Sequence, residues 1–262
     1  MYKNKGTKTS DNTEVREDLL VGRNAVLEAL KHGRTMNKVY LLDGAKGGSV
    51  GEITALARDK GIMLDFVRRE KLEEMAPGLN NQGVIAQVSP VAFHELGEVL
   101  ALAQTKQEVP FLLLLDELQD PQNVGALLRT AEAAGVHGVL LPQRRSCPLN
   151  ATVAKTSAGA IEYIPVVKIG NVNQTIQELK KQGFWIVGAD MAGKDTYFDA
   201  NLTGPIVLVV GAEGKGLTRL VKENCDILVR IPMGSGVSSL NASVAGAILL
   251  YEVVRQRQGL SS

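Results

Sequence analysis

Six apolar runs follow one another through the second half of the chain. They are continuously apolar rather than alternating, which is typical of strands that are covered on both faces. The segments between the runs are long enough for helices, so the pattern predicts an α/β domain built on a parallel sheet. Ligands of such sheets bind beyond the carboxyl ends of the strands. The runs span residues 111–116, 138–142, 163–167, 184–189, 206–211 and 227–231.

A smaller α/β unit is predicted for residues 18–90, because helical and strand-like segments alternate there as well. Helical spacing indicates helices over 21–30 and 51–60. Short apolar runs indicate strands over 39–43, 63–67 and 83–88.

The segments outside these units are polar or of mixed composition. Residues 1–17 carry three early lysines and no apolar period, which predicts a flexible basic tail. Residues 91–109 are expected to be a linker, within which 95–104 is either a short helix or a partly ordered connector. The larger domain is then expected to occupy residues 110–262.

The composition excludes several classes of protein. No apolar run is as long as a membrane span, which needs roughly 18 residues or more, and the first residues lack the apolar core of a signal peptide. Cys147 and Cys225 fit no zinc or redox motif and are expected to be reduced thiols in a cytoplasmic protein. Since the formal net charge is only +1, any contact with nucleic acid must use local basic patches.

The segment 116–135 begins a helix directly after an apolar run. Pro121 suits the first turn of this helix, and either Asp120 or Asn123 can cap it. Leucines and alanines form its buried face, and helical spacing places Arg129 at the edge of that face. On these grounds alone the segment is an ordinary helix start.

Two glycine-rich loops follow later runs. The first, 211–217, has glycines spaced G-x-x-G-x-G, which is neither the dinucleotide fingerprint nor a Walker A loop. It indicates a tight strand-to-helix turn with a solvated Glu213. The second loop, 231–241, leads into a helix that is expected to run from Asn241, its N-cap, to about Arg255. Glycine-rich loops also let backbone groups approach a ligand closely.

Other polar residues give weaker signals. Arg144, Arg145 and Lys155 flank the expected carboxyl edge of the sheet, as solvated charges or as phosphate contacts. No G-x-S-x-G sequence is present, so a serine hydrolase is not expected. Three histidines have no motif around them and are expected at the surface or at helix ends: His32, His94 and His137.

Taken in order, residues 116–135, 207–217 and 231–247 resemble the three motifs of the SpoU/TrmH family of RNA ribose 2′-O-methyltransferases. The resemblance implies an RNA substrate and S-adenosyl-L-methionine as methyl donor, with no need for a metal. It assigns cofactor contacts to Gly211 and to backbone groups of Ile231 and Leu240. The catalytic residues that it implies are Asn123, Arg129, Glu213, Ser239 and Asn241.

The resemblance gives Arg129 contact with the substrate phosphate and with the ribose 2′-hydroxyl. Because an arginine side chain is normally protonated, positioning and polarising the hydroxyl is the preferred role, and general base is the bolder one. Ala242 stands where the family usually has valine, which is a minor departure.

The resemblance also implies a fold and an assembly. Members have a parallel-sheet SPOUT domain with a C-terminal trefoil knot, which spacing alone would not propose. Residues 21–30 and 80–86 resemble the two ends of the family's small RNA-binding domain, which is similar to a ribosomal protein of the L30e type; Asn81 stands where members often have histidine. Members are homodimers, so a twofold dimer built on the helices at 120–135 and 241–255 is expected.

The small domain favours the bacterial subgroup that methylates a guanosine ribose in 23S ribosomal RNA. Three other functions compete with this one. The first is a tRNA 2′-O-methyltransferase of the same family, and the second is a non-catalytic, ribosome-associated RNA-binding protein. The third is a nucleotide-dependent oxidoreductase, against which the missing G-x-G-x-x-G sequence argues.

Overall fold

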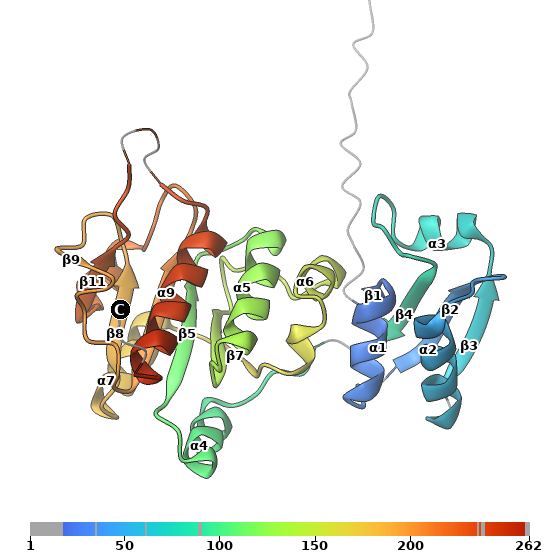
Figure 1. Ribbon diagram of the computed structural model, residues 1–262, viewed down its shortest axis with the longest axis horizontal. Coiled ribbons are helices and arrows are strands. Elements are labelled where there is room, and N and C mark those ends of the chain that lie inside the picture. Colours follow the sequence, from blue (N-terminus) through green and yellow to red (C-terminus); the bar gives the residue numbers. More distant parts are fainter. Residues whose placement is uncertain are drawn as a thin grey trace, which may run out of the picture.

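A computed structural model describes residues 18–34, 36–60, 62–88, 91–234, 236 and 239–259. Its strands form two separate sheets, each covered by helices (Figure 1). The segment 1–17, for which a flexible basic tail is predicted, lies outside the described residues.

The larger sheet has seven strands in the order β7-β6-β5-β10-β8-β11-β9, and every pair of neighbours is parallel. This confirms the prediction of an α/β fold with a parallel sheet. The strands are β5 (Phe111–Asp116), β6 (Gly138–Pro142), β7 (Val166–Ile169), β8 (Trp185–Ala189), β9 (Asp195–Thr196), β10 (Ile206–Gly211) and β11 (Ile227–Arg230).

The predicted strand over 163–167 starts three residues too early. A 3₁₀ turn, η1 (Ala160–Glu162), precedes it and continues through Tyr163, so pairing begins only at Val166. The edge strand β9 has two residues and was not predicted, because a two-residue strand leaves no periodic pattern.

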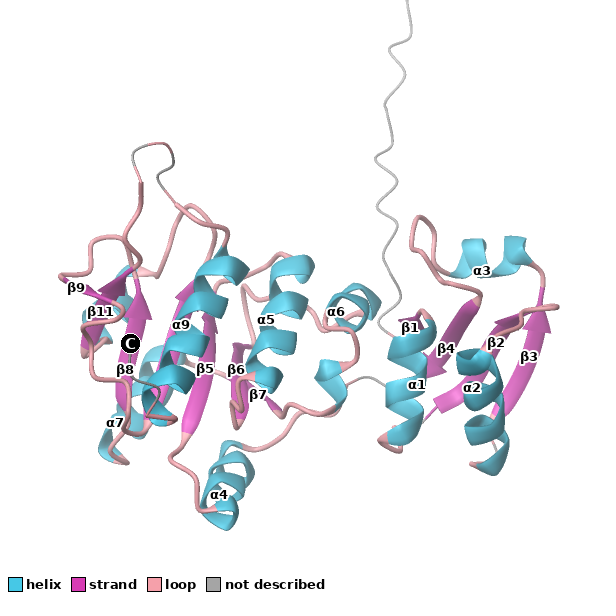
Figure 2. Cartoon of the chain, viewed as in Figure 1, coloured by secondary structure: helices cyan, strands magenta, loops and turns pink. Residues whose placement is uncertain are grey.

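Two helical layers explain why the strands are continuously apolar. Side chains of β5 alternate between the faces: Leu113 and Leu115 belong to one buried cluster, and Leu112 and Leu114 to another. The first cluster includes residues of α5 (Pro121–Ala133) and α9 (Ala242–Arg257). Figure 2 shows these two helices side by side on one face of the sheet. The opposite face is covered by α4 (Leu96–Lys106), α7 (Val172–Lys181) and α8 (Arg219–Asn224).

Helix α4 lies within the segment expected to be a linker, so the helical alternative for 95–104 is the one the structure shows. Val99 and Ala103 of this helix are fully buried. A methyl group added at Gly138 of β6 would lie 2.5 Å from a Val99 methyl, so the helix packs directly on the strand. Helix α4 therefore contributes Val99 and Ala103 to the packing on the larger sheet.

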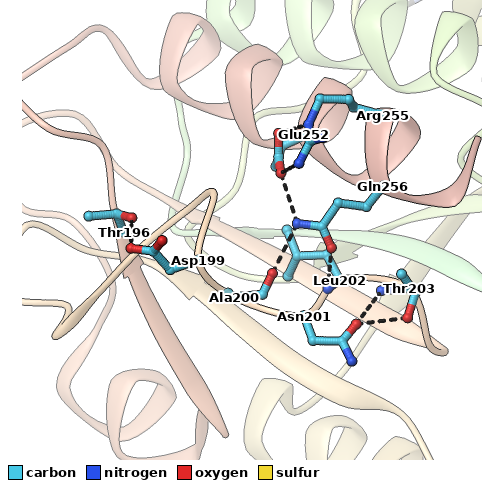
Figure 3. Close-up of polar contacts among 9 residues, drawn as sticks. All are labelled: Thr196, Asp199, Ala200, Asn201, Leu202, Thr203, Glu252, Arg255 and Gln256. Carbon is cyan, nitrogen blue, oxygen red and sulfur yellow. Dashed lines mark hydrogen bonds and ion pairs between the residues drawn. The ribbon is translucent and has the colours of Figure 1, made fainter. Parts of the chain in front are cut away.

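The C-terminal half of α9 is fixed to the loop 196–203 by polar contacts (Figure 3). The amide of Gln256 donates to the Ala200 carbonyl (2.9 Å) and to Glu252 (2.8 Å), and it accepts from the Leu202 N–H (2.8 Å). Arg255 donates to both oxygens of the buried Glu252 carboxylate. Its hydrogen bonds lower the pKa of that carboxyl.

Replacing Gln256 with Met should destabilise the fold while keeping the side chain's length. The substitution leaves the Leu202 N–H and the Ala200 carbonyl without partners, which costs about 1–3 kcal/mol for a buried polar group. Urea denaturation of both proteins measures the difference. Gln258→Met, at an exposed position next to the same helix, is the control and should change stability by less than about 0.5 kcal/mol. Equal midpoints for the two variants would contradict the anchoring role.

The smaller sheet is mixed, with the strand order β1-β4-β2-β3. Its β2 pairs antiparallel with β4 and parallel with β3, while β1 pairs antiparallel with β4. The predicted helix over 21–30 begins two residues too early, because Val21 is the last residue of a strand, Leu19–Val21. The elements are β1 (Leu19–Val21), α1 (Arg23–Lys31), β2 (Met36–Leu42), α2 (Gly48–Asp59), β3 (Met63–Val67), α3 (Arg69–Met75) and β4 (Val84–Val88).

The two sheets are joined through α6 (Ala151–Thr156), which packs on β1. Ala151 is fully buried and belongs to the same apolar cluster as Leu19, Leu72 and Ile85 of the smaller unit. Polar contacts reinforce this junction. Arg34 forms an ion pair with Glu162 (2.5 Å), and Tyr163 is hydrogen-bonded to Glu28.

His137, expected at the surface or a helix end, is buried where the chain enters β6; its side chain is only 3% exposed. Its Nδ1 accepts from the Phe111 N–H (3.1 Å), so Nε2 carries the proton and donates to Glu108 (3.0 Å). Burial lowers the pKa of His137, although the Glu108 carboxylate opposes that effect.

This burial predicts a pH dependence of stability. Because the folded state holds His137 with a lowered pKa, the unfolded state binds more protons below the ordinary value of about 6.5. The contribution is complete above that pH and is lost as the pH falls below it. The free energy of unfolding should therefore drop from pH 7 to pH 5, and His137→Gln should show a shallower slope. His94→Gln, at an exposed histidine, should keep the slope of the unmodified chain; an identical slope in all three proteins would refute the assignment.

Candidate functional site

A pocket of about 350 Å³ lies at the carboxyl ends of β8, β10 and β11. It is lined by parts of three segments, 189–192, 210–216 and 229–245, and by Lys222. Its wall is largely apolar and includes Val210, Val229 and Met233. Five of the eight residues that the sequence singled out are among the lining residues: Gly211, Glu213, Ile231, Ser239 and Leu240.

The turn after β10 folds back on itself. Ala212 and Gly216 exchange backbone hydrogen bonds of 3.1 and 2.8 Å. A Cβ atom at Gly211 would lie 2.2 Å from the Gly216 carbonyl oxygen, so only glycine fits there. The Thr218 N–H donates to the buried carboxylate of Asp116 (2.6 Å), which ties the end of the turn to β5; burial raises the pKa of Asp116. The tight turn predicted for 211–217 is present, with Glu213 exposed on it.

One carboxylate oxygen of Glu213 contacts two other residues that the sequence predicted for the catalytic site. Its Oε2 accepts from the side-chain amide of Asn123 (3.4 Å) and from that of Asn241 (3.5 Å). Asn123 lies in the first turn of α5 and is buried, whereas Asn241 precedes α9. The amino ends of two helices and the turn after β10 therefore meet at the rim of the pocket.

The capping residues of the two helices are now distinguished. Asp120, rather than Asn123, caps α5, because its Oδ2 accepts from the Asn123 N–H (3.0 Å). Asn241 caps α9 as expected: its Oδ1 accepts from the N–H groups of Ser243 (2.9 Å) and Val244 (3.3 Å). Asn241 therefore uses its oxygen for the helix and its nitrogen for Glu213.

Arg129 lies apart from this cluster. It is exposed on α5 and, within the described residues, has no hydrogen-bond or ion-pair partner and does not line the pocket. Six residues of helix separate it from Asn123, about 9 Å along the axis and about 120° around it. The sequence placed Arg129 at the edge of the buried face, but it projects from the solvent side because Leu127, Leu128 and Ala131 occupy the inner side.

The sequence did not single out the loop after β8. Asp190 lies in that loop, and its carboxylate accepts from the Ala192 N–H (2.8 Å) and pairs with Lys222 of α8 (2.7 Å). Both Asp190 and Lys222 line the pocket. The loop contains no glycine cluster before Gly193, so only its position at the carboxyl end of a parallel strand could have pointed to it.

The cysteines and the remaining charged groups near the sheet's carboxyl edge were also considered as site residues in the sequence. Among the described residues no group of three histidine, cysteine or acidic side chains is placed to hold a metal ion. Both cysteines are free thiols; burial raises the pKa of Cys147 to about 11 and that of Cys225 to about 12. Arg145 pairs with Glu117 (2.9 Å), whereas Arg144 is exposed.

Comparison with known proteins identifies the family. The profile of the SpoU rRNA Methylase family matches residues 110–251, more than half of the chain. The chain belongs to the SpoU rRNA methylase family. A second profile, described as RNA 2′-O ribose methyltransferase substrate binding, matches residues 19–94.

Relatives agree with this assignment over nearly the whole chain. The protein YacO of Bacillus subtilis, assigned to the TrmH family of tRNA/rRNA methyltransferases, is 45% identical over 240 residues, covering 92% of this chain and 96% of the relative. A protein of Staphylococcus saprophyticus with the same assignment is 42% identical over 241 residues, covering 92% and 96%. The SpoU-family chain is thus an RNA methyltransferase that uses S-adenosylmethionine, as the resemblance implied.

Solved structures share the fold. The SpoU methyltransferase AviRb of Streptomyces viridochromogenes, in complex with the cofactor AdoMet, superposes with a TM-score of 0.78 at 24% identity and covers 95% of each chain. An RNA 2′-O ribose methyltransferase superposes with a TM-score of 0.76 at 26% identity, covering 92% of this chain and 88% of that one. No helix in the described part of the chain is long and apolar enough to cross a membrane.

The double use of Asn241 can be separated by substitution. Asn241→Asp keeps a capping oxygen, so stability should change by less than about 0.5 kcal/mol. It removes the amide donor and places a second carboxylate beside Glu213, so methyl transfer should fall at least about tenfold, which is one 1.4 kcal/mol step in the barrier. Thermal unfolding and turnover are measured on the same preparation.

The matched control is Asn171→Asp at the cap of α7, where the side chain accepts from the Gln174 N–H (3.1 Å) outside the pocket. This variant should keep full turnover. Normal turnover in Asn241→Asp would show that the contact between Asn241 and Glu213 has no part in the chemistry.

Proposed function

We propose that this chain transfers a methyl group from S-adenosyl-L-methionine to the 2′-hydroxyl of a guanosine in 23S ribosomal RNA, in the cytoplasm. The observation that carries the proposal is the pocket at the strand ends. Gly211, Ile231 and Leu240 line it together with Glu213, whose carboxylate also contacts Asn123 and Asn241. A methyltransferase needs a cofactor cavity and a polar cluster side by side, so that the reacting atoms can be held in line.

The pocket has the character that S-adenosylmethionine requires. Its wall combines apolar side chains with backbone groups of the glycine turn, a common composition for cofactor pockets. The close approach at Gly211 keeps the turn narrow, because no side chain separates it from the Gly216 backbone. We assign cofactor contacts to Gly211, Ile231 and Leu240. When bound there, the cofactor supplies an activated methyl group on its sulfonium.

The chain's own residues have separate tasks in this proposal. Asn123 and Asn241 hold Glu213 in one orientation at the rim of the pocket. Glu213 and Ser239 contact the ribose and keep its 2′-hydroxyl directed into the pocket. Arg129 engages the neighbouring phosphate and polarises the hydroxyl, because a guanidinium is suited to a planar, two-point contact with phosphate.

A homodimer would bring Arg129 to a subunit boundary. Val244 and Tyr251 of α9 are about half exposed (48% and 51%), although both are apolar or aromatic. They lie on the helix that packs against α5, which carries the exposed Arg129. A twofold dimer built on α5 and α9 would cover this face.

Two features of fold and organisation complete the proposal. The match to the SpoU rRNA Methylase family over residues 110–251 supports a C-terminal trefoil knot like that of SPOUT domains. The two sheets and the two matched profiles support a division into an L30e-like RNA-recognition unit at 18–90 and a methyl-transfer unit at 110–262.

The extent of the structural matches favours ribosomal RNA over tRNA as the substrate. A tRNA-modifying TrmH/SpoU enzyme of Aquifex aeolicus covers only 62% of this chain, with a TM-score of 0.53. An rRNA methyltransferase of Sinorhizobium meliloti matches the fold over 95% of it, with a TM-score of 0.75. The smaller unit accompanies the match to the ribosomal enzyme, which supports recognition of a large structured RNA.

The experiment that tests the proposal uses labelled S-adenosylmethionine with undermethylated 23S ribosomal RNA and, separately, with bulk tRNA. Methylation of a 2′-hydroxyl leaves dinucleotides that resist alkali, and blocked primer extension maps their position. Label in 23S ribosomal RNA at a guanosine is expected. Label confined to tRNA would establish the tRNA alternative, and RNA binding without label in either RNA would overturn the assignment of 23S ribosomal RNA as the substrate.

Arg129→Ala should abolish most methyl transfer while the affinity for S-adenosylhomocysteine, measured by calorimetry, stays unchanged. The reason is that its proposed partner is RNA phosphate rather than the cofactor. Arg129→Lys should rescue poorly, because a point charge does not reproduce the planar guanidinium. Arg219→Ala, at an exposed arginine of α8 on the opposite face of the sheet, should retain activity. Near-normal turnover in Arg129→Ala would remove this residue from the mechanism.

Tyr251→Arg should convert the dimer to monomers and lower methyl transfer. A charge in the centre of an apolar contact is costly to bury without a partner. Leu220→Arg is the matched control, because Leu220 is also 51% exposed but lies on α8. Light scattering at micromolar concentration reports the oligomeric state. A stable, active monomer of the unmodified chain would exclude the dimer.

A further inference from the structure

A second cavity, of about 850 Å³, lies in the smaller unit between the amino end of α1, helix α3 and the turn before β4. It shares no lining residue with the pocket at the strand ends. Nothing in the proposed methyl transfer uses it. The site rests on the proposed function in one respect, which is that RNA is the substrate.

The wall formed by the turn before β4 is held rigidly. Gln82 adopts a left-handed backbone conformation (φ 51°) that is uncommon for a residue with a side chain. Two hydrogen bonds from Arg23 keep it there: its side-chain oxygen accepts from the Arg23 N–H (3.1 Å), and its carbonyl accepts from Arg23 Nε (3.0 Å). Asn81 accepts from the Gly83 N–H (2.8 Å). The cavity is therefore preformed on this side.

The lining combines three kinds of group. Leu42 and Leu79, both partly buried, supply the accessible apolar area, whereas Leu72 is almost completely buried beside them. Arg23 and Arg69 supply positive charge, and Glu73 supplies a single negative charge.

Helical spacing puts Arg69 and Glu73 on the same side of α3, four residues apart. Neither side chain has an ion-pair or hydrogen-bond partner within the described residues, and both are exposed. They are therefore free to contact a ligand.

We propose that this cavity holds one unpaired guanosine nucleotide of the substrate RNA. The base lies on the leucine surface with its Watson–Crick edge toward Glu73, and the adjoining phosphate is bound by Arg69 and Arg23. Proteins that read RNA sequence take hold of splayed-out bases in this way, through stacking or apolar contact and through the base edges.

The Glu73 carboxylate determines which base fits the cavity. Guanine presents two neighbouring donors, N1–H and the N2 amino group, on its Watson–Crick edge, and a carboxylate accepts from both at once. Adenine, cytosine and uracil each offer at most one donor there beside an acceptor, which would face the carboxylate unfavourably. Glu73 also disfavours an isolated phosphate or an acidic peptide, because either would bring like charges together.

Binding of labelled pentanucleotides to the full-length protein tests this site. The probes are UUGUU, UUAUU, UUCUU and UUUUU, measured by fluorescence anisotropy at one low salt concentration. UUGUU should bind about tenfold more tightly than the others, the size expected for one good bidentate base contact. Glu73→Gln should remove that preference. Arg69→Ala should weaken all four probes and reduce the salt dependence by about one phosphate contact.

Neighbouring residues of the same type provide the controls. Arg68 is exposed beside Arg69 and does not line the cavity, and Glu74 pairs with Lys71 outside it (3.1 Å). Arg68→Ala and Glu74→Gln should leave both affinity and base preference unchanged. Equal binding of all four probes, or equal effects of Arg68→Ala and Arg69→Ala, would overturn the proposal.

A second readout separates this site from the proposed function. Glu73→Gln should raise KM for ribosomal RNA severalfold, with kcat and the affinity for S-adenosylhomocysteine unchanged. Loss of kcat or of cofactor affinity would mean a structural role and would count against the site. If 23S ribosomal RNA is methylated normally and the pentanucleotides show no preference, the site is wrong while the proposed function stands. If no RNA is methylated but UUGUU is preferred, the guanosine site is supported and the proposed function is wrong.

Discussion

The rest of the candidate site depends on the close backbone contact between Gly211 and Gly216. It lets the chain leave β10, reverse and return within a few residues, because no side chain stands between the two backbone segments. The buried Asp116 carboxylate then holds the end of the turn against β5 through Thr218. With its base fixed in this way, the turn presents Glu213 to α5 and α9. A side chain at position 211 would displace the acidic group as well as the turn.

Much of the larger sheet could be predicted from its sequence because both of its faces are covered. Strands β5, β6 and β10 have the predicted bounds, since burial on two sides leaves an uninterrupted apolar run. The same reasoning brought Gly211, Ile231 and Leu240 to one edge, because the carboxyl ends of parallel strands share an edge.

Other features could not be predicted, for reasons that differ. Helical spacing predicts only roughly which side of its helix Arg129 occupies. The family resemblance gives Arg129 a role but does not place it relative to the pocket. The loop that carries Asp190 has no distinctive composition, and its pairing with Lys222 joins residues far apart in the chain. The second cavity draws on both ends of the smaller unit, so Arg23 and the pair Arg69 and Glu73 came to line one cavity only through the fold. Long-range pairings of this kind leave no periodic trace in a sequence.

The buried junction at α6 ties the two sheets together. Ala151 is contributed by the larger half of the chain but is buried in the apolar cluster of the smaller half. The two halves are therefore not structurally independent, because separating them would expose an apolar cluster to which both contribute. In the division of labour proposed above, this packing would set the distance between the unit that recognises the RNA and the pocket in which the RNA is methylated. A change in the length or angle of α6 would then alter which nucleotide of a bound RNA reaches the pocket, without changing the residues of either unit's site.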